Sequence, residues 1–240
     1  MRTVDTVLFD LDDTLHDDSR AYRAAARLAA DDVARSHGIA SDVLASAYDR
    51  EVKRFWGNLT AAQLSIGIDD SRTQMWYAAL LAAGIDDRAL AQATAASYSR
   101  YRSDVLELAP GALALVETLR ARGCKLGIVT NGFAATHHDK IARLGLTQRV
   151  DAVFLADEMG MVKPDPGVFT HAMAQLGSTA GRTAMVGDRY DRDIAGALAL
   201  GLFTVLIDVH ATPLPANAPP PDATVDTVAE VLDVLPLARA

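Results

Sequence analysis

The sequence predicts an α/β fold with a mostly parallel sheet and a helical bundle inserted after its first strand. Five short apolar, β-branched runs are typical of buried parallel strands, and after the first run they alternate with helical patterns. Residues 10–124 separate the first run from the second, which is far more chain than one crossover connection needs. Most of that interval has helical periodicity, so a second, helical domain is expected there.

The strands and helices of the main domain follow one another along the chain. The predicted strands are Thr6–Phe9, Lys125–Thr130, Ala152–Leu155, Thr183–Val186 and Phe203–Ile207. The predicted helices are Gly111–Arg122, Thr136–Leu144, Pro166–Gln175 and Asp191–Leu200, with a last helix near Val225–Leu235. This alternation indicates βαβ units and therefore a sheet covered on both faces. The proline-rich segment Pro213–Pro221 is expected to form an exposed loop.

The inserted segment contains four helical patterns and no convincing strand. They lie near Ser19–His37, Ser41–Trp56, Asp70–Ala83 and Asp87–Arg102. Ser19, Ser41 and Asp70 are candidate N-caps, and Gly38 and Gly84 are candidate helix ends. We therefore expect a main domain formed by residues 1–16 and 106–240, and a helical domain formed by residues 17–105.

Composition excludes several classes of function. The chain has 240 residues, 31 acidic against 23 basic, and a formal net charge of −8, which disfavours nucleic acid as a partner. We expect no membrane span, because no run of apolar residues is long enough. The first residues pass directly into a strand pattern, so we expect no signal peptide and a cytoplasmic protein. A single cysteine, Cys124, excludes an intrachain disulfide and a thiolate metal cluster.

Polar residues follow four of the predicted strands. They are Asp10 and Asp12 after the first strand, Thr130, Asn131 and Gly132 after the second, Lys163 between the third strand and the next helix, and Asp188 and Asp193 after the fourth. In an open parallel sheet, ligands bind beyond the carboxyl ends of the strands. Clustered carboxylates repel one another unless a cation holds them. The pattern therefore predicts a functional site at this rim.

These residue types suit the hydrolysis of a phosphate ester. Of Asp10 and Asp12, one can attack phosphorus while the other handles the proton of the leaving group. Carboxylates without neighbouring histidine or cysteine ligands suit Mg²⁺, for which Asp10 and Asp188 are the natural pair. The hydroxyl of Thr130 and the backbone amides of Asn131 and Gly132 can bind phosphoryl oxygens. Lys163 supplies positive charge for the transferred group or for Asp10.

This prediction rests on the polar residues after all four strands taken together, and not on any one motif. Aspartate supplies 26 of the 31 acidic residues, so an Asp-x-Asp-x-Thr string such as Asp10–Thr14 arises easily by chance. Lys163 is more informative, since the chain has only four lysines and this one stands in a Lys-Pro loop. The four elements occur in order, each at the end of a strand. This favours a functional site over polar strand ends that are only solvated.

The ordered set resembles the haloacid dehalogenase (HAD) superfamily. Its four motifs are matched by Asp10-x-Asp12-x-Thr14, by Thr130, by Lys163, and by Gly187-Asp188 with Asp193. The resemblance implies a Rossmann-like three-layer core with the first strand central, and a helical cap that closes over the site. It also implies that Asp10 is the nucleophile and Asp12 the general acid and base. Mg²⁺ would be held by Asp10, the backbone carbonyl of Asp12 and Asp188, with Asp193 in support in preference to its neighbour Asp191.

The resemblance covers enzymes with different reactions. Its dehalogenase members lack the second aspartate of the first motif, because a halide leaving group needs no proton. Asp12 therefore favours phosphoryl transfer, and Asp12-Asp13-Thr14-Leu15 replaces the Asp-Gly-Val usual in the β-phosphoglucomutase branch.

We expect an Mg²⁺-dependent phosphatase acting on a small phosphomonoester, such as a sugar phosphate, a nucleotide or phosphoglycolate, as a monomer or homodimer. The alternatives are a 2-haloacid dehalogenase and a non-catalytic binding module of the same fold. His137 and His138 follow the second motif and are expected on a solvated helix face.

Overall fold

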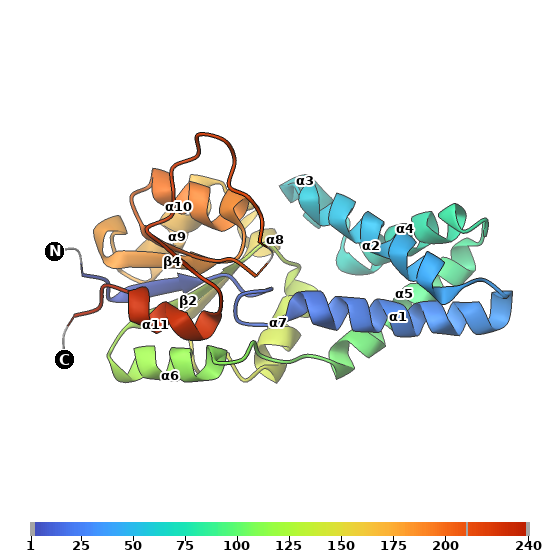
Figure 1. The fold of residues 1–240 in the computed structure, drawn as a ribbon, viewed down its shortest axis with the longest axis horizontal. Helices are drawn as coiled ribbons and strands as arrows, with labels where there is room; N and C mark the ends of the chain where they lie inside the picture. Colours follow the sequence, from blue (N-terminus) through green and yellow to red (C-terminus); the bar gives the residue numbers. More distant parts are fainter. Residues whose placement is uncertain (1–2, 210, 239–240) are drawn as a thin grey trace. The chain divides into compact units, whose positions relative to one another are not determined.

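The computed structural model describes residues 3–209 and 211–238, and it contains two compact units (Figure 1). One unit, Met1–Asp17 with Leu108–Ala240, is called the core; the other, Asp18–Glu107, is called the cap. The domain boundaries expected from the sequence, after residues 16 and 105, stay predictions. No helix among the described residues has both the length and the apolar character that a membrane crossing requires.

The core is built on a parallel sheet of six strands in the order β3-β2-β1-β4-β5-β6. Every neighbouring pair is parallel, which confirms the predicted α/β class. The strands are β1 (Thr6–Phe9), β2 (Lys125–Thr130), β3 (Ala152–Leu155), β4 (Thr183–Gly187), β5 (Phe203–Ile207) and β6 (Ala223–Val225).

Strand β1 occupies a central position, and all four of its residues are buried. Its last residue, Phe9, is in register with Ile128 of β2 and with Val186 of β4. The carboxyl ends of these three strands therefore lie at one edge of the sheet. The residues that follow them are brought together by topology, although they are far apart in the sequence.

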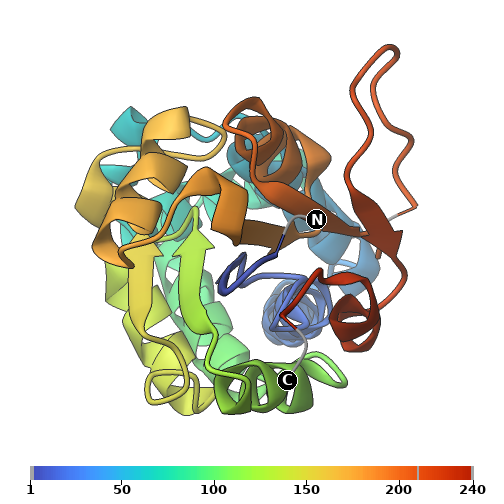
Figure 2. The same cartoon turned by 90° about the vertical axis from the view of Figure 1, so that its left-hand side faces the viewer.

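Helices cover both faces of the sheet. On one face lie α9 (Pro166–Gln175) and α10 (Ala195–Ala199), and on the other lie α6 (Ala112–Ala121) and α11 (Val231–Val234) (Figures 1 and 2). Phe169 of α9 packs in one buried cluster with Leu8 of β1 and Met185 of β4. This arrangement confirms the predicted Rossmann-like three-layer core. Two further helices, α7 (Ala134–Arg143) and α8 (Ala156–Met159), follow β2 and β3.

Two expected helices of the core differ from prediction. The helix expected at Asp191–Leu200 begins with a π-helical turn, Tyr190–Ile194, and continues as α10. The last predicted helix begins instead as strand β6, followed by a 3₁₀ turn at Val228–Glu230 and the short α11. Val225 is extended because it pairs with Ile207 of β5, and Asp222, just before β6, exchanges hydrogen bonds of 2.8–3.0 Å with Thr204 of β5. The proline-rich segment forms a mostly exposed loop, as expected.

The cap is a bundle of helices, as predicted for the inserted segment. Its helices are α1 (Asp18–His37), α2 (Ser41–Gly57), α3 (Ala61–Leu64), α4 (Ile68–Ala82) and α5 (Arg88–Asp104), of which α3 was not predicted. The prediction of the N-caps was wrong, because Ser19, Ser41 and Asp70 lie inside helices. Gly38 and Gly84 do follow the ends of α1 and α4, with φ of 67° and 84°, a backbone conformation that favours glycine.

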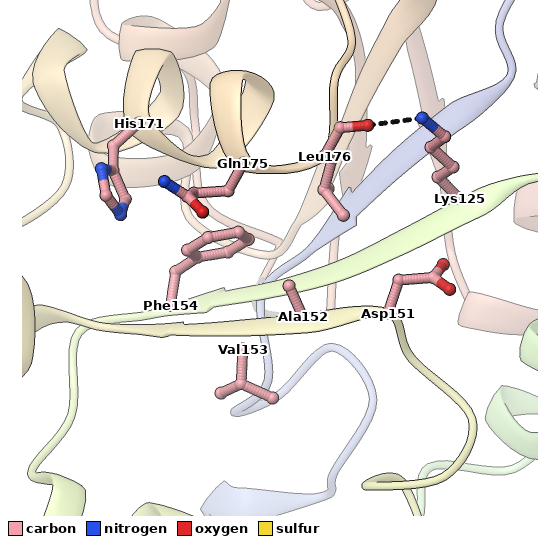
Figure 3. Close-up of a pocket in the computed structure, with 8 residues that line it drawn as sticks. All are labelled: Lys125, Asp151, Ala152, Val153, Phe154, His171, Gln175 and Leu176. Atoms are coloured by element: carbon pink, nitrogen blue, oxygen red, sulfur yellow. Dashed lines mark hydrogen bonds between the residues drawn. The ribbon is translucent and has the colours of Figure 1, made fainter.

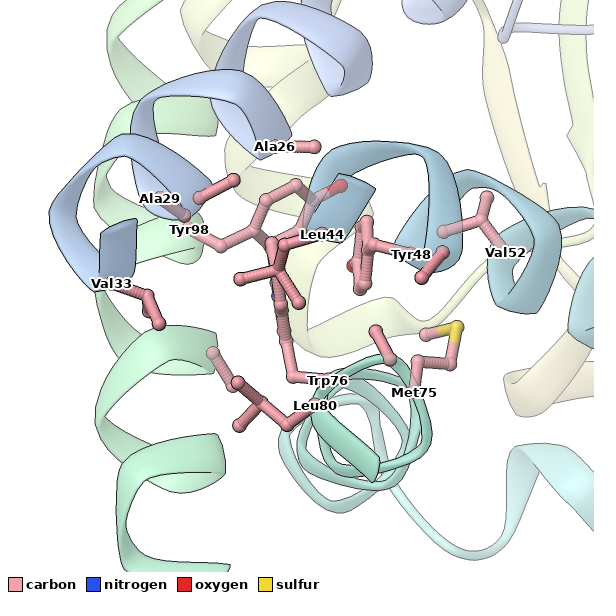
Figure 4. Close-up of a cluster of buried hydrophobic side chains, with 14 of the residues drawn as sticks. Ala26, Ala29, Val33, Leu44, Tyr48, Val52, Met75, Trp76, Leu80 and Tyr98 are labelled. Carbon is pink, nitrogen blue, oxygen red and sulfur yellow. The ribbon is translucent and has the colours of Figure 1, made fainter. Parts of the chain in front are cut away.

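An aromatic cluster forms the centre of the cap (Figure 4). Trp76 of α4 is fully buried and stacks on Tyr48 of α2, with ring centroids 3.9 Å apart. Tyr98 of α5 meets Tyr48 edge-on at 5.1 Å. Small residues of α1, such as Ala26 and Ala29, let that helix pack closely against this cluster. The cap therefore has a hydrophobic core of its own.

Candidate active site

Asp10 is the first residue after β1 and lies at the centre of the site. Its backbone N–H donates to Val186 O of β4 at 2.9 Å, which continues the pairing of the strands by one residue. Asp10 is 7% exposed. A carboxylate this deeply buried needs compensating charge or hydrogen bonds.

Lys163 supplies that compensation. It is 3% exposed, and its Nζ donates to Oδ1 of Asp10 at 2.6 Å, to Oδ1 of Asp193 at 2.6 Å and to Val129 O at 2.7 Å. An ammonium group has three donors, so Lys163 is fully hydrogen-bonded. Two buried carboxylates thus share one buried cation.

Asn131 fixes the Lys163 loop against the end of β2. Its side-chain Oδ1 accepts from the backbone N–H of Lys163 at 2.8 Å, and its Nδ2 donates to the carbonyl of Lys163 at 2.9 Å. The side chain of Asn131 therefore holds the Lys163 loop in place, a role that was not expected from the sequence. The backbone amides of Asn131 and Gly132 were expected to bind phosphoryl oxygens, and that role stays a prediction. Thr130, the last residue of β2, is buried beside them.

Asp193 reaches the site because glycine stands at position 187. A Cβ atom on residue 187 would lie 2.4 Å from the carboxyl group of Asp193, so a larger residue would displace it. Asp193 is 1% exposed, and its Oδ2 accepts from the backbone N–H of Arg189 at 3.0 Å. Asp191 points elsewhere, since its carboxylate is largely exposed and pairs with Arg189. Of these two aspartates, the structure brings Asp193 to Asp10.

Three carboxylates form a group that could hold a metal ion. Ligand oxygens of Asp10, Asp188 and Asp193 all lie within 4.8 Å of one another. Burial raises the pKa of Asp10 well above its usual value; Lys163 opposes this shift, and the charges of Asp193, Asp188 and Asp12 add to it. Ionised Asp10 therefore needs more positive charge than Lys163 provides. A set of hard oxygen donors with excess negative charge fits Mg²⁺.

The carboxylate of Asp12 contacts helix α7. Its Oδ1 accepts from Nζ of Lys140 at 2.7 Å, and its Oδ2 lies 3.4 Å from Nε2 of His137. Both α7 residues are at most 5% exposed. The solvated face expected for His137 was therefore wrong, whereas His138 is exposed and contacts Glu158.

Sequence reasoning did not identify Lys140 as a site residue. The available signal was the spacing of His137 and Lys140, three residues apart on a helix that directly follows the second motif, and therefore on one helix face.

A separate cavity of about 590 Å³ lies at the β3 edge of the sheet (Figure 3). Phe154 and His171 line it, together with Lys125, whose Nζ donates to Leu176 O at 2.6 Å. None of the predicted site residues lines this cavity. It contains no group of converging carboxylates, so the rim around Asp10 remains the candidate active site.

The comparison with known proteins agrees with the motifs. The model of the haloacid dehalogenase-like hydrolase family matches residues 4–201. This chain belongs to that family. The match includes every candidate site residue from Asp10 to Asp193.

Two relatives of this hydrolase match it over nearly the full length. It is 33% identical to ribulose-1,5-bisphosphate 5-phosphatase of Halopiger xanaduensis, over 95% of this chain and 98% of that protein. It is 30% identical to glyceraldehyde 3-phosphate phosphatase of Methanopyrus kandleri, over 97% of each chain.

Solved structures share the fold. The HAD-hydrolase YfnB of Bacillus subtilis, determined bound to magnesium, superposes with a TM-score of 0.80 at 24% identity, over 97% of this chain and 99% of that one. A 2-haloacid dehalogenase of Pseudomonas syringae superposes with a TM-score of 0.65 at 26% identity, over 97% of this chain and 98% of that one. The fold is therefore shared with a magnesium-bound HAD-hydrolase and with a 2-haloacid dehalogenase.

Proposed function

We propose that this hydrolase is an Mg²⁺-dependent phosphatase that cleaves small phosphomonoesters through an aspartyl-phosphate on Asp10. The proposal rests mainly on Asp10 and Asp12, two aspartates that lie on one loop but in different surroundings. Asp10 is buried among Lys163 and two further carboxylates, and Asp12 is half-buried two residues later. The nearly full-length similarity to two phosphatases supports the same reaction.

In the first step, a carboxylate oxygen of Asp10 attacks phosphorus. A phosphorus–oxygen bond forms at Asp10 while the ester bond breaks, and Asp12 gives a proton to the leaving alkoxide. The hydroxyl of Thr130, the backbone amides of Asn131 and Gly132, and the charge of Lys163 stabilise the transferred group. In the second step, water attacks phosphorus and Asp12 takes a proton from the water. The phosphorus–oxygen bond to Asp10 breaks, inorganic phosphate leaves, and Asp10 is again a carboxylate.

Mg²⁺ would be held by Asp10, Asp188 and the backbone carbonyl of Asp12, with Asp193 in support. When bound, it would offset the negative charge that accumulates as an anionic substrate meets an anionic nucleophile. Lys163 already neutralises part of this charge, because it touches both Asp10 and Asp193 at 2.6 Å. The acidic composition of the chain is therefore compatible with an anionic substrate.

The presence of Asp12 also favours a phosphatase over a dehalogenase. A halide leaves as a stable anion, so a dehalogenase has no use for a proton donor at this position. We infer substrates whose leaving group needs a proton, in the class of sugar phosphates, nucleotides or phosphoglycolate. The cytoplasmic location and the monomeric or homodimeric state stay predictions.

The test is hydrolysis of p-nitrophenyl phosphate with Mg²⁺, with EDTA, and by Asp10→Asn. We expect activity that requires Mg²⁺ and is abolished in the variant. Near wild-type activity of Asp10→Asn would contradict the mechanism. Chloride release from a 2-haloacid in EDTA would support a dehalogenase, and inactivity in both assays would support a binding module. A panel of phosphorylated metabolites compared by kcat/KM then identifies the substrate.

A further inference from the structure

Each of the two motif aspartates has a buried lysine of its own. Lys163 bonds Asp10, and Lys140 bonds Asp12 at 2.7 Å. Lysine is almost never fully buried unless it is paired, yet the Lys140 side chain is only 7% exposed. The bond joins residues 128 positions apart in the sequence. The contact therefore results from the core fold and not from local helix geometry.

The second oxygen of Asp12 also lies close to helix α7. Nε2 of His137 lies 3.4 Å from Oδ2 of Asp12, and Nδ1 of the same ring lies 3.1 Å from Phe133 O. Gly132 makes room for this ring, because a Cβ atom there would lie 2.1 Å from Nε2. His137 and Lys140 thus approach the two oxygens of one carboxylate from one helix face.

We propose that Lys140 is a positioning residue for Asp12, which it holds in the orientation needed for proton transfer with the leaving-group oxygen. The inference rests on the proposed phosphatase function. The Asp12 side chain is 31% exposed, so without a partner on the protein side it would sample several rotamers. A charge-assisted hydrogen bond to a buried ammonium restricts it to one. Misplacement of a catalytic group by about 1 Å can cost about 100-fold in rate.

Lys140 differs in this role from Lys163. Lys163 contacts Asp10 and Asp193, on the side of the nucleophile and the acidic group, so its loss affects the transfer of every phosphate ester. Lys140 contacts the aspartate that handles the proton. Its loss is expected to matter in proportion to how much the leaving group needs that proton. The dependence on the leaving group therefore separates the two lysines.

The experiment measures kcat/KM for p-nitrophenyl phosphate, phenyl phosphate and benzyl phosphate in the wild type and in Lys140→Met. These esters are similar in size, and their leaving groups need a proton increasingly in that order. The parameter kcat/KM includes the steps up to cleavage of the ester bond. We expect a loss of about 10- to 100-fold for benzyl phosphate and a much smaller loss for p-nitrophenyl phosphate, with KM little changed.

Two further variants complete the design. Arg143→Met removes a cationic side chain that lies on the same helix but is 47% exposed, and it should leave all three values unchanged. Lys140→Gln keeps a hydrogen-bond donor without the charge. Its losses in kcat/KM should rank the three esters in the same order but should be smaller. This variant replaces Lys140→Met in the experiment if Lys140→Met does not fold.

Equal losses with all three esters, or no loss with any, would overturn the positioning role. If the wild type hydrolyses none of them in Mg²⁺, the proposed function fails instead, so the two failures are distinguishable.

Discussion

The ammonium of Lys163 lies 2.6 Å from Oδ1 of Asp10, and both side chains are buried at the carboxyl ends of the central strands. The same ammonium lies 2.6 Å from Asp193. Burial by itself would lower the pKa of Lys163, but the charges of Asp10 and Asp193 outweigh burial and raise it. Lys163 is therefore charged at neutral pH, and one cation serves two carboxylates. We therefore expect both the stability of the core and its proposed activity to depend on Lys163.

Replacing Lys163 by methionine is expected to destabilise the core and abolish phosphatase activity. The substitution keeps the apolar stem but leaves Asp10 and Asp193 buried without their common partner. Removal of one member of a buried ion pair typically costs about 3–5 kcal/mol. Urea unfolding in EDTA measures the loss. Lys53→Met is the control, because Lys53 is 65% exposed and pairs only with Asp49 among the described residues.

Adding Asp193→Asn to Lys163→Met should restore part of the stability without restoring activity. The double variant removes one of the two uncompensated charges, so the two effects should not be additive. Asp193→Asn should also lower the free energy of unfolding when it is made in the wild type. If it lowers that of Lys163→Met by the same amount, the effects are additive, and the coupling that the 2.6 Å contact indicates is absent.

Mg²⁺ is expected to raise the melting temperature of the wild type, independently of catalysis. A ligand that binds only the folded state stabilises it by about 2.7 kcal/mol when its concentration is 100 times its Kd. Asp188→Asn removes one member of the acidic group and should reduce this shift strongly. Asp191→Asn is the matched control, since Asp191 is exposed and paired with Arg189. Equal shifts in both variants would place the metal elsewhere.

The stability difference between Asp10→Asn and the wild type should grow with pH when metal is absent. The unfolded chain releases the Asp10 proton near its ordinary pKa of 3.8, whereas burial holds the folded-state pKa well above that value. The folded state then binds more protons than the unfolded state, so stability falls as pH rises through this interval. Asparagine has no proton to release and avoids this loss. Melting temperatures in EDTA from about pH 4 upward check this, and a constant difference would contradict it.

The strands that carry the site could be predicted from the sequence, because each of them is a recognisable run of neighbouring apolar residues. Thr6–Phe9 and Lys125–Thr130 are continuous apolar runs, and parallel topology then places whatever follows them at one edge. The observed bounds of these strands equal the predicted ones. Strand β6 was missed because its three residues gain extended structure only from pairing with β5.

The partners of Asp12 could not be predicted in the same way. A lysine on a helix is usually solvated, and nothing in the residues around Lys140 shows that an aspartate 128 positions away lies within reach. The choice of Asp193 over Asp191 was expected from the family resemblance alone, and its physical reason is three-dimensional. It follows from the space beside Gly187 and from the π-helical turn, neither of which has a reliable local signal.

Trp76→Ala is expected to unfold the cap at a lower denaturant concentration. Both tryptophans of the chain, Trp56 and Trp76, belong to the cap, so tryptophan emission reports on this unit and not on the core. Trp76 is fully buried and stacks on Tyr48, and truncation of a buried tryptophan costs about 3–5 kcal/mol. Trp56→Ala removes a half-buried ring, which meets Phe55 edge-on at 5.2 Å, and should cost less. Urea titrations followed by emission of the remaining tryptophan compare the two variants. Equal midpoints would show that the stacked aromatic cluster does not determine the stability of the cap.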